Sequence, residues 1–217
     1  MKSPFSFRLV DVAALGLVGG QLVGSALAFA RLPERFPIHF DLHGTADGFS
    51  SRAVGAFLMP CVSLALWAFV RTFPRRLTGE ARARALASPP LAETALLVTG
   101  LMAGLHFVML EVALSGSGAA GRGLGFVLAS FTLALGLLLP KLRRNGIAGI
   151  RTPYTLSSDE TWQKTHRIGG IFFFVAGLVG LVGTALGSVA VVIGALVVAT
   201  LASAVYSFLA GRPASSR

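Results

Sequence analysis

Six apolar stretches, each about as long as a bilayer is thick, constrain this chain more than any other feature of its sequence. A membrane-spanning helix needs roughly 20 mostly apolar residues. Such stretches cover residues 9–30, 54–73, 91–114, 124–140, 168–188 and 189–210. Each is apolar on every side, unlike the one-sided stripe of a helix in a soluble protein. The sequence therefore predicts an all-α fold, a polytopic membrane bundle of six transmembrane helices.

The composition excludes the main alternatives to a membrane protein. Only 13% of the residues are charged and 54% are hydrophobic, whereas about a quarter of a soluble domain is charged. Too little polar surface remains to cover a soluble globule, and the chain is too apolar to be disordered. The single cysteine, Cys61, rules out a disulfide framework and a cysteine-based metal site. Nothing in the sequence calls for a cofactor.

The basic residues predict the orientation of the bundle. Alternate segments between the apolar stretches hold 15 Lys and Arg on one side and 4 on the other. The positive-inside rule then places both termini and loop 141–167 in the cytoplasm, and loop 31–53 outside. Residues 1–30 also have a second interpretation as a cleaved signal peptide, because Lys2 and Arg8 precede an apolar run that ends in small residues. Cleavage would leave the orientation unchanged.

Glycines recur at four-residue spacing within the apolar stretches. Small residues let helix backbones approach closely in a membrane. We expect these glycines to pack helices within one bundle, and a homodimer seam is the alternative. They are Gly16, Gly20 and Gly24; Gly100 and Gly104; and Gly183 and Gly187.

Polar side chains inside the apolar stretches are candidates for function, because burying them in hydrocarbon is costly. Asp11 and Glu111 lie near the ends of their stretches, where we expect water or headgroups to solvate them. His106 lies deepest, and we interpret it as a hydrogen-bonded core residue, with a functional role as the alternative. His106 and Glu111 are five residues apart, so they face different sides of a helix.

The outward loop 31–53 is rich in turn-forming and polar residues. Pro33 and Pro37 are expected to end the first helix and hold the chain extended. His39, Asp41 and His43 would then project to one face, and Asp47-Gly48 predicts a turn. These two histidines and Asp41 are weak candidates for zinc ligands. We favour a structured polar loop that packs over the end of the bundle.

The inward loop 141–167 predicts a helix that leads into the fifth apolar stretch. Ser157 with Glu160 matches a capping box, so the helix should begin near Ser158. Trp162 and His166 are four residues apart and should lie together on that helix.

The residues before this helix mix apolar and basic side chains. Ile147, Ala148 and Ile150 predict a segment on the membrane surface, with Arg151 at the depth of the lipid phosphates. The simplest interpretation is a lipid anchor with Trp162 in the aromatic belt.

Two regions of the chain resemble known bacterial membrane proteins. Asn145 and the run Gly149-Ile150-Arg151-Thr152-Pro153-Tyr154-Thr155-Leu156, followed by Trp162, Lys164, Thr165, His166 and Arg167, resemble the signature of the SdpI family. That family usually has Trp in place of Tyr154. Leu32-Pro33, Pro37, His39-Phe40, Gly44 and Asp47-Gly48 resemble a domain of unknown function that often precedes it. The resemblance divides the chain into residues 1–53, 54–140 and 141–217.

The resemblance implies a function as well as a fold. SdpI is an immunity protein that protects its bacterium from a secreted peptide toxin, and it also captures a transcriptional repressor at the membrane. We therefore expect a non-enzymatic protein of the bacterial plasma membrane that meets a peptide toxin outside and a cytosolic repressor-type protein inside, without contacting nucleic acid. The predicted outward site is His39, Phe40, Asp41, Gly44 and Asp47, and the predicted inward site is Asn145, Gly149, Arg151, Thr152, Pro153, Trp162, Thr165 and His166.

Two other functional classes remain open from the sequence. A metal-dependent hydrolase would use the outward histidines and aspartates. A small transporter or channel would use two three-helix halves, whose long loops fall on opposite sides as in an inverted repeat.

Overall fold

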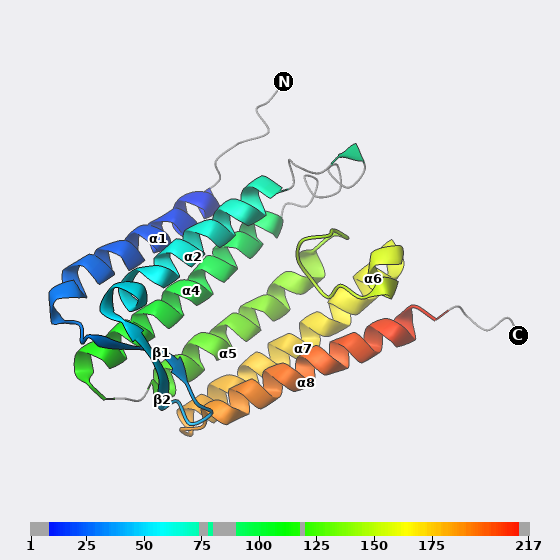
Figure 1. Ribbon diagram of the computed structural model, residues 1–217. Coiled ribbons are helices and arrows are strands. Elements are labelled where there is room, and N and C mark those ends of the chain that lie inside the picture. Colours follow the sequence, from blue (N-terminus) through cyan, green and yellow to red (C-terminus); the bar gives the residue numbers. More distant parts are fainter. Residues whose placement is uncertain (1–8, 74–77, 80–89, 118–119, 213–217) are drawn as a thin grey trace, which may run out of the picture.

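The computed structural model describes residues 9–73, 78–79, 90–117 and 120–212, and within them six long helices form an antiparallel bundle (Figure 1). All six are long and apolar enough to cross a membrane, which confirms the predicted fold class. Exposed apolar side chains such as Leu27, Val198 and Leu201 cover their outer faces, as expected where hydrocarbon is the solvent. The helices are α1 (Leu9–Ala28), α2 (Arg52–Thr72), α4 (Pro90–Ser115), α5 (Gly121–Leu138), α7 (Asp159–Ala185) and α8 (Val189–Ala210).

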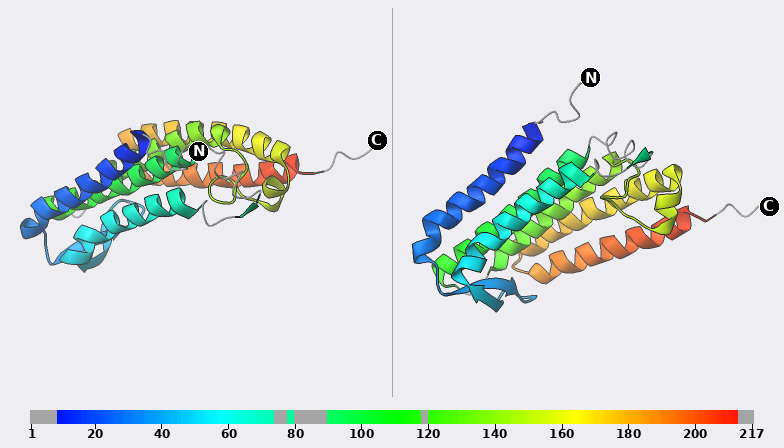
Figure 2. Two further views of the ribbon diagram at one scale, coloured as in Figure 1. Left: turned by 90° about the horizontal axis from the view of Figure 1, so that it is seen from above. Right: turned by 45° about the horizontal axis from the view of Figure 1, so that its top comes forward.

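The bundle consists of two three-helix halves. Helices α1, α2 and α4 pack together, as do α5, α7 and α8, and α4 against α5 joins the halves (Figure 2). The described segment begins and ends at the same end of the bundle, here called the terminal end (Figure 1). The opposite end carries a two-stranded sheet and is called the hairpin end. The charge bias predicts that the terminal end faces the cytoplasm.

A β-hairpin connects α1 to α2. After the short helix η1 (Phe29–Arg31), β1 (Arg35–Phe40) pairs antiparallel with β2 (Ala46–Ser51). Phe36 is fully buried beneath the hairpin, and a side chain at Gly55 of α2 would overlap its ring. Together with Leu32 and Leu110, Phe36 belongs to an apolar cluster that holds the hairpin against the helices.

The turn of this hairpin differs from the prediction. Asp47 and Gly48 lie within β2, and the chain reverses at residues 41–45 instead. The Asp41 carboxylate accepts hydrogen bonds from the backbone N–H groups of His43 and Thr45, both at 2.8 Å. Gly44 supplies the positive φ, +81°, that the reversal requires. The side chain of Asp41 therefore shapes the turn, which the Asp-Gly pattern at 47–48 did not reveal.

The glycine prediction is confirmed for some positions and wrong for others. A Cβ at Gly104 or Gly183 would meet a valine of the neighbouring helix within 3 Å, so these glycines do allow close packing. Gly16, Gly20 and Gly100 instead have nothing within 4 Å of a Cβ among the described residues. Gly16 and Gly20 are exposed, and Gly100 is half-buried in a groove that Leu17 and Phe126 also line.

Asp11 is not solvated at a membrane interface, contrary to expectation. Its side chain is 2% exposed and forms an ion pair with Arg71, with Nε to Oδ1 at 2.7 Å and Nη2 to Oδ2 at 2.9 Å. Trp67 Nε1 donates a further hydrogen bond to Asp11 at 3.3 Å. A buried carboxylate is tolerated when it is paired and hydrogen-bonded. The pair ties α1 to α2 at the terminal end.

His106 lies in the core, as predicted, and its hydrogen-bond partner, Ser25, is itself oriented by a carbonyl that a proline leaves free. Pro60 inside α2 has no N–H, so the carbonyl of Ala56 lacks its helical hydrogen bond. Ser25 Oγ donates to that carbonyl at 2.5 Å and lies 2.9 Å from His106 Nε2. Because the Ser25 hydrogen is used on Ala56, His106 Nε2 is the donor to Ser25.

The remaining intramembrane polar groups divide between core and surface. Ser63 Oγ donates to Gln21 Oε1 at 3.1 Å, next to the Ser25 cluster on α1. Glu111 is exposed on the face of α4 away from His106, in agreement with the predicted separation.

Candidate functional site

The signature loop, residues 142–158, covers the terminal end of the second half. It runs from the short helix η3 (Leu139–Lys141) through α6 (Pro153–Ser157) to the start of α7. Trp162 on α7 is fully buried beneath it and stacks on His166, with ring centroids 4.0 Å apart and planes inclined by 17°. Trp162 Nε1 donates to the carbonyl of Leu142 at 2.8 Å. The predicted proximity of Trp162 and His166 is confirmed, but Trp162 does not lie in an aromatic belt.

His166 holds the loop by both ring nitrogens. The backbone N–H of Ile150 donates to Nε2 at 3.0 Å, so Nε2 is an acceptor and Nδ1 carries the proton toward the Trp162 carbonyl at 2.8 Å. Gly149 precedes this contact with φ +119°, and a Cβ there would overlap His166 Nε2. The imidazole is thus a neutral structural clamp that requires glycine at position 149.

Asn145 shapes the first half of the signature loop. Its Oδ1 accepts from the N–H groups of Ile147 and Ala148 at 2.8 and 2.9 Å. Its Nδ2 donates to the carbonyls of Arg143 and Ala148 at 2.7 and 3.2 Å. With these four contacts the Asn145 side chain replaces the backbone partners that a tight turn lacks.

The turn at Asn145 brings two half-buried apolar residues of the loop against the first half of the bundle. Ile147 and Ala148 pack there on a cluster formed by Trp67, Val70, Leu91 and Ala95. Ile150 packs into the core of the second half. The apolar residues among the charges therefore bridge the two halves of the bundle.

Threonine and serine side chains organise the rest of the loop. Thr152 and Thr155 form a capping box on α6, which begins with Pro153, and Thr155 Oγ1 also donates to the Ile150 carbonyl at 2.8 Å. Helix α7 begins at Asp159, and Ser158 accepts from the N–H of Thr161. The predicted start is confirmed, but the predicted cap is wrong.

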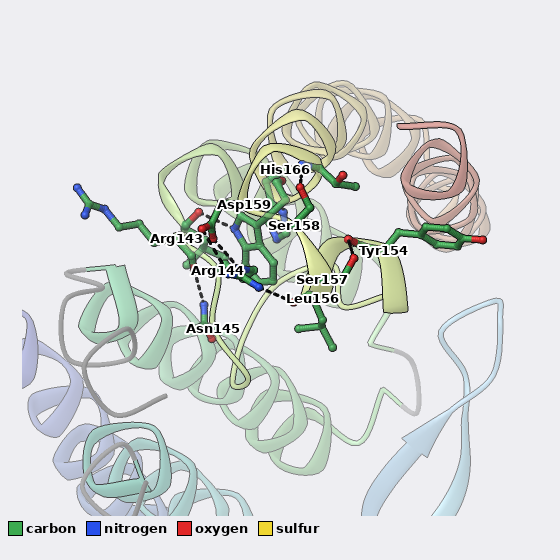
Figure 3. Close-up of polar contacts among 12 residues, drawn as sticks. Arg143, Arg144, Asn145, Tyr154, Leu156, Ser157, Ser158, Asp159 and His166 are labelled. Atoms are coloured by element: carbon green, nitrogen blue, oxygen red, sulfur yellow. Dashed lines mark hydrogen bonds and ion pairs between the residues drawn. The ribbon is translucent and has the colours of Figure 1, made fainter. Parts of the chain in front are cut away.

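Ser157, the residue predicted to cap α7, is occupied within α6. Its Oγ donates to the carbonyl of Tyr154 at 2.9 Å. Tyr154 extends toward α8, where its ring meets Phe208 edge-on at 5.1 Å (Figure 3). Thr165, predicted in the site, is fully buried in α7.

The charges of the signature loop separate into paired and outward-facing groups. Arg144 donates hydrogen bonds to the carboxylate of Asp159 at 2.5 Å and to the carbonyl of Leu156 at 2.7 Å (Figure 3). Arg151 donates to the carbonyl of Gly146 at 2.6 Å. Arg143 extends away from this network in Figure 3. The exposed cations at this end include Lys141, Arg143, Arg151 and Arg167.

The predicted outward residues lie on the β-hairpin, and a close polar contact joins two of their side chains. His39 Nδ1 and Asp47 Oδ1 are 2.5 Å apart, and the His39 side chain is 71% exposed. The strand register is irregular on both sides of His39, and a Cβ at Gly48 would lie 2.7 Å from the Cβ of His39. Such a bulge redirects a side chain out of the regular strand alternation.

The weak zinc site does not form in this geometry. Asp41 is engaged in the turn, and the N–H groups of Thr45 and His43 hold the pKa of its carboxyl below the usual value. Within the residues that the structure describes, no three His, Cys, Asp or Glu side chains lie together as metal ligands. His43 remains exposed beside the turn.

Each of the two loops reaches across to the opposite half of the bundle. The hairpin belongs to the first half, but the N–H of Ala120 at the start of α5 donates to the carbonyl of Gly44 at 2.7 Å. A Cβ at Gly44 would lie 2.8 Å from the nitrogen of Gly121, so only glycine permits this contact. The signature loop belongs to the second half and contacts the first through Ile147 and Ala148. The halves are therefore joined at both ends by the two loops.

Family models match both of these regions. Residues 141–207 match the SdpI/YfhL protein family, and residues 16–64 match the Domain of unknown function (DUF1648). The family resemblance found in the sequence is confirmed by these matches. Searches of curated proteins and of solved structures gave no match. The chain is therefore a multi-pass membrane protein, and its residues 141–207 are similar to the SdpI/YfhL protein family.

Proposed function

We propose that this chain is a non-enzymatic immunity or receptor protein of the bacterial plasma membrane. Its β-hairpin would bind a secreted peptide toxin outside the cell. An acidic cytosolic regulator would bind the exposed cations at the terminal end, here called the basic surface: Lys141, Arg143, Arg151 and Arg167. The SdpI/YfhL match supports this class of protein.

The observation that carries the proposal is that each of the two loops contacts the opposite half of the bundle. The hairpin contacts α5 through Gly44, and the signature loop contacts α2 and α4 through Ile147 and Ala148. A ligand that shifts the hairpin relative to α5 would change the angle between the halves. The signature loop bridges the same halves at the other end, so the change would reach the basic surface there. Two sites coupled through one two-state element are what signal transduction requires.

The basic surface suits an acidic protein partner. Lys141 and Arg143 are exposed, and Arg143 extends away from the internal network of the loop (Figure 3). The rest of the loop is held rigid by Asn145 and His166. A fixed array of cations steers an acidic partner and sets its orientation.

Survival of a toxin-sensitive bacterium tests the outward role. Cells expressing the chain should survive a dose of secreted peptide toxin that kills cells without it. His39→Ala should reduce protection, whereas His43→Ala, an exposed histidine four residues away, should not. No protection by the wild-type chain at good membrane expression, against a panel of such toxins, would contradict the immunity role.

Recruitment at the membrane tests the inward role. A cytosolic repressor-type protein labelled with a fluorophore should move to membranes that contain the chain when toxin is added. Lys141→Glu with Arg143→Glu should abolish the movement, and Arg122→Glu at the hairpin end should leave it intact. Equal recruitment by both variants would show that the basic surface is not the binding site.

A further inference from the structure

A small apolar pocket lies where the β-hairpin rests on the helices. Its volume is about 180 Å³. The hairpin contributes Ile38, His39 and Phe40 to its wall, and the helices contribute Met59, Val108 and Met109 among others. An apolar cavity of roughly 150 Å³ is known to accommodate benzene. The pocket therefore has the size of one aromatic ring.

The chemistry of the lining favours an aromatic ring over an aliphatic chain. Met59 and Met109 come from two different helices, and thioether sulfur makes favourable contacts with aromatic rings. Phe40 adds an aromatic face that a second ring can meet edge-on. An aliphatic chain, such as a lipid tail, would gain neither contact.

A polar group stands at the rim of this apolar pocket. His39 contributes to the wall, yet its side chain is largely in solvent. Asp47 Oδ1 accepts a hydrogen bond from His39 Nδ1–H, so Nε2 of the neutral imidazole presents its lone pair. The bulge at His39 and the glycine at position 48 set this orientation. A backbone N–H next to an inserted side chain could donate to Nε2.

From this combination we infer that the hairpin pocket binds one aromatic side chain of a peptide, with His39 accepting a hydrogen bond from the peptide backbone. The inference deepens the proposed function, on which it rests for the peptide's origin. It names the feature by which the outward site would recognise its ligand: a phenylalanine-like residue presented to the hairpin end.

Binding of small amides to the full chain in lipid nanodiscs tests the pocket. The probes are N-acetyl-phenylalaninamide, its cyclohexylalanine analogue and N-acetyl-alaninamide, with binding followed by saturation-transfer NMR. The phenylalanine probe should bind about 10- to 100-fold tighter than the alanine probe, as expected for burying one large side chain. It should also bind more tightly than the more hydrophobic cyclohexyl probe, by about 2- to 10-fold from the sulfur–ring contacts.

Matched variants show whether the pocket is the site. Val108→Phe fills it and should remove the preference for phenylalanine over alanine, whereas Val198→Phe, on the exposed surface of α8, should keep it. Met59→Leu with Met109→Leu conserves the volume and should make the aromatic and cyclohexyl probes bind equally. This second variant decides the matter if Val108→Phe does not fold. His39→Ala should weaken binding of the phenylalanine probe several-fold.

The outcomes separate the pocket from the immunity role. Equal binding of all three probes to the wild-type chain, or a preference for the cyclohexyl probe, would overturn the aromatic pocket and favour a lipid tail. If the phenylalanine probe binds as expected and the chain gives no protection, the pocket stands and the immunity role fails. If the chain protects cells and Val108→Phe protects equally, the pocket is not the site of toxin recognition.

Discussion

Removing the carboxylate of Asp11 should destabilise the protein strongly, because it leaves a cation without its partner at the terminal end. Asp11 is 2% exposed and Arg71 is 18% exposed, and they share two contacts of 2.7 and 2.9 Å. Breaking a buried ion pair from one side costs about 3–5 kcal/mol. Arg71 keeps some access to solvent in the last turn of α2, so we expect Asp11→Ala to cost about 3 kcal/mol, the lower end of that range.

The same pair should show a large coupling in a double-mutant cycle. Replacing both residues together, as Asp11→Leu with Arg71→Met, should cost much less than Asp11→Ala alone, since no charge is then left unpaired. The assay is unfolding in SDS, followed by circular dichroism in mixed micelles. Glu160 and Lys164 serve as the control, because this ion pair is exposed on both sides, at 75% and 55%. If Asp11→Ala destabilised the chain no more than Glu160→Ala, the buried pair would not hold α1 against α2.

Three further outcomes follow from single contacts. Ser25→Ala should lower the free energy of unfolding by about 1–3 kcal/mol because it leaves the Ala56 carbonyl without a hydrogen bond. Adding Pro60→Ala should restore much of that loss, because it returns the helical N–H to this carbonyl. Equal melting temperatures of the single and double variants would contradict this. Gly149→Ala should destabilise the signature loop by about 1–3 kcal/mol, from its positive φ, and speed its cleavage by trypsin in inside-out vesicles; unchanged cleavage would show that the loop tolerates a Cβ. The pKa of the Asp41 carboxyl is lowered in the folded turn, so its stabilising contribution is present above the unfolded value of 3.8 and is lost as the pH falls through the folded value. In the wild type, the protection factors of the turn amides against hydrogen exchange should therefore fall as the pH falls. In Asp41→Asn these protection factors should be lower and independent of pH.

The helices and their number could be predicted because a membrane span is a continuous stretch of sequence. Its length and apolar content alone identify it, and all six predicted stretches coincide with long helices. The proximity of Trp162 and His166 was predictable for the same reason, since it depends only on the helical repeat.

The contacts between distant segments could not be predicted, because no local pattern encodes them. Asp11 looks like an interfacial carboxylate until Arg71, sixty residues away, is placed beside it. The packing of Ile147 and Ala148 against the other half of the bundle is likewise not encoded in the residues around them. The position of Trp162 was unpredictable for the same reason, because its indole N–H donates to the Leu142 carbonyl, twenty residues earlier in the chain, rather than to lipid headgroups.

One missed feature did carry a signal in the sequence. Pro60 inside a predicted span implies a free carbonyl four residues earlier, and a polar side chain from another helix is the usual way to satisfy it. Together with Ser25 and His106 in other spans, this pattern could have indicated the polar cluster.

Labelling from each side of the membrane tests most directly whether the hairpin meets the outside and the signature loop the cytoplasm. In a Cys61→Ser background, Leu42→Cys at the hairpin tip and Leu156→Cys in α6 would each place one thiol on an exposed position. A membrane-impermeant maleimide should label Leu42→Cys in intact cells and should label Leu156→Cys only after the membrane is opened. Labelling of Leu156→Cys in intact cells, with Leu42→Cys protected, would invert the topology and remove the basis for an outward toxin site and an inward regulator site.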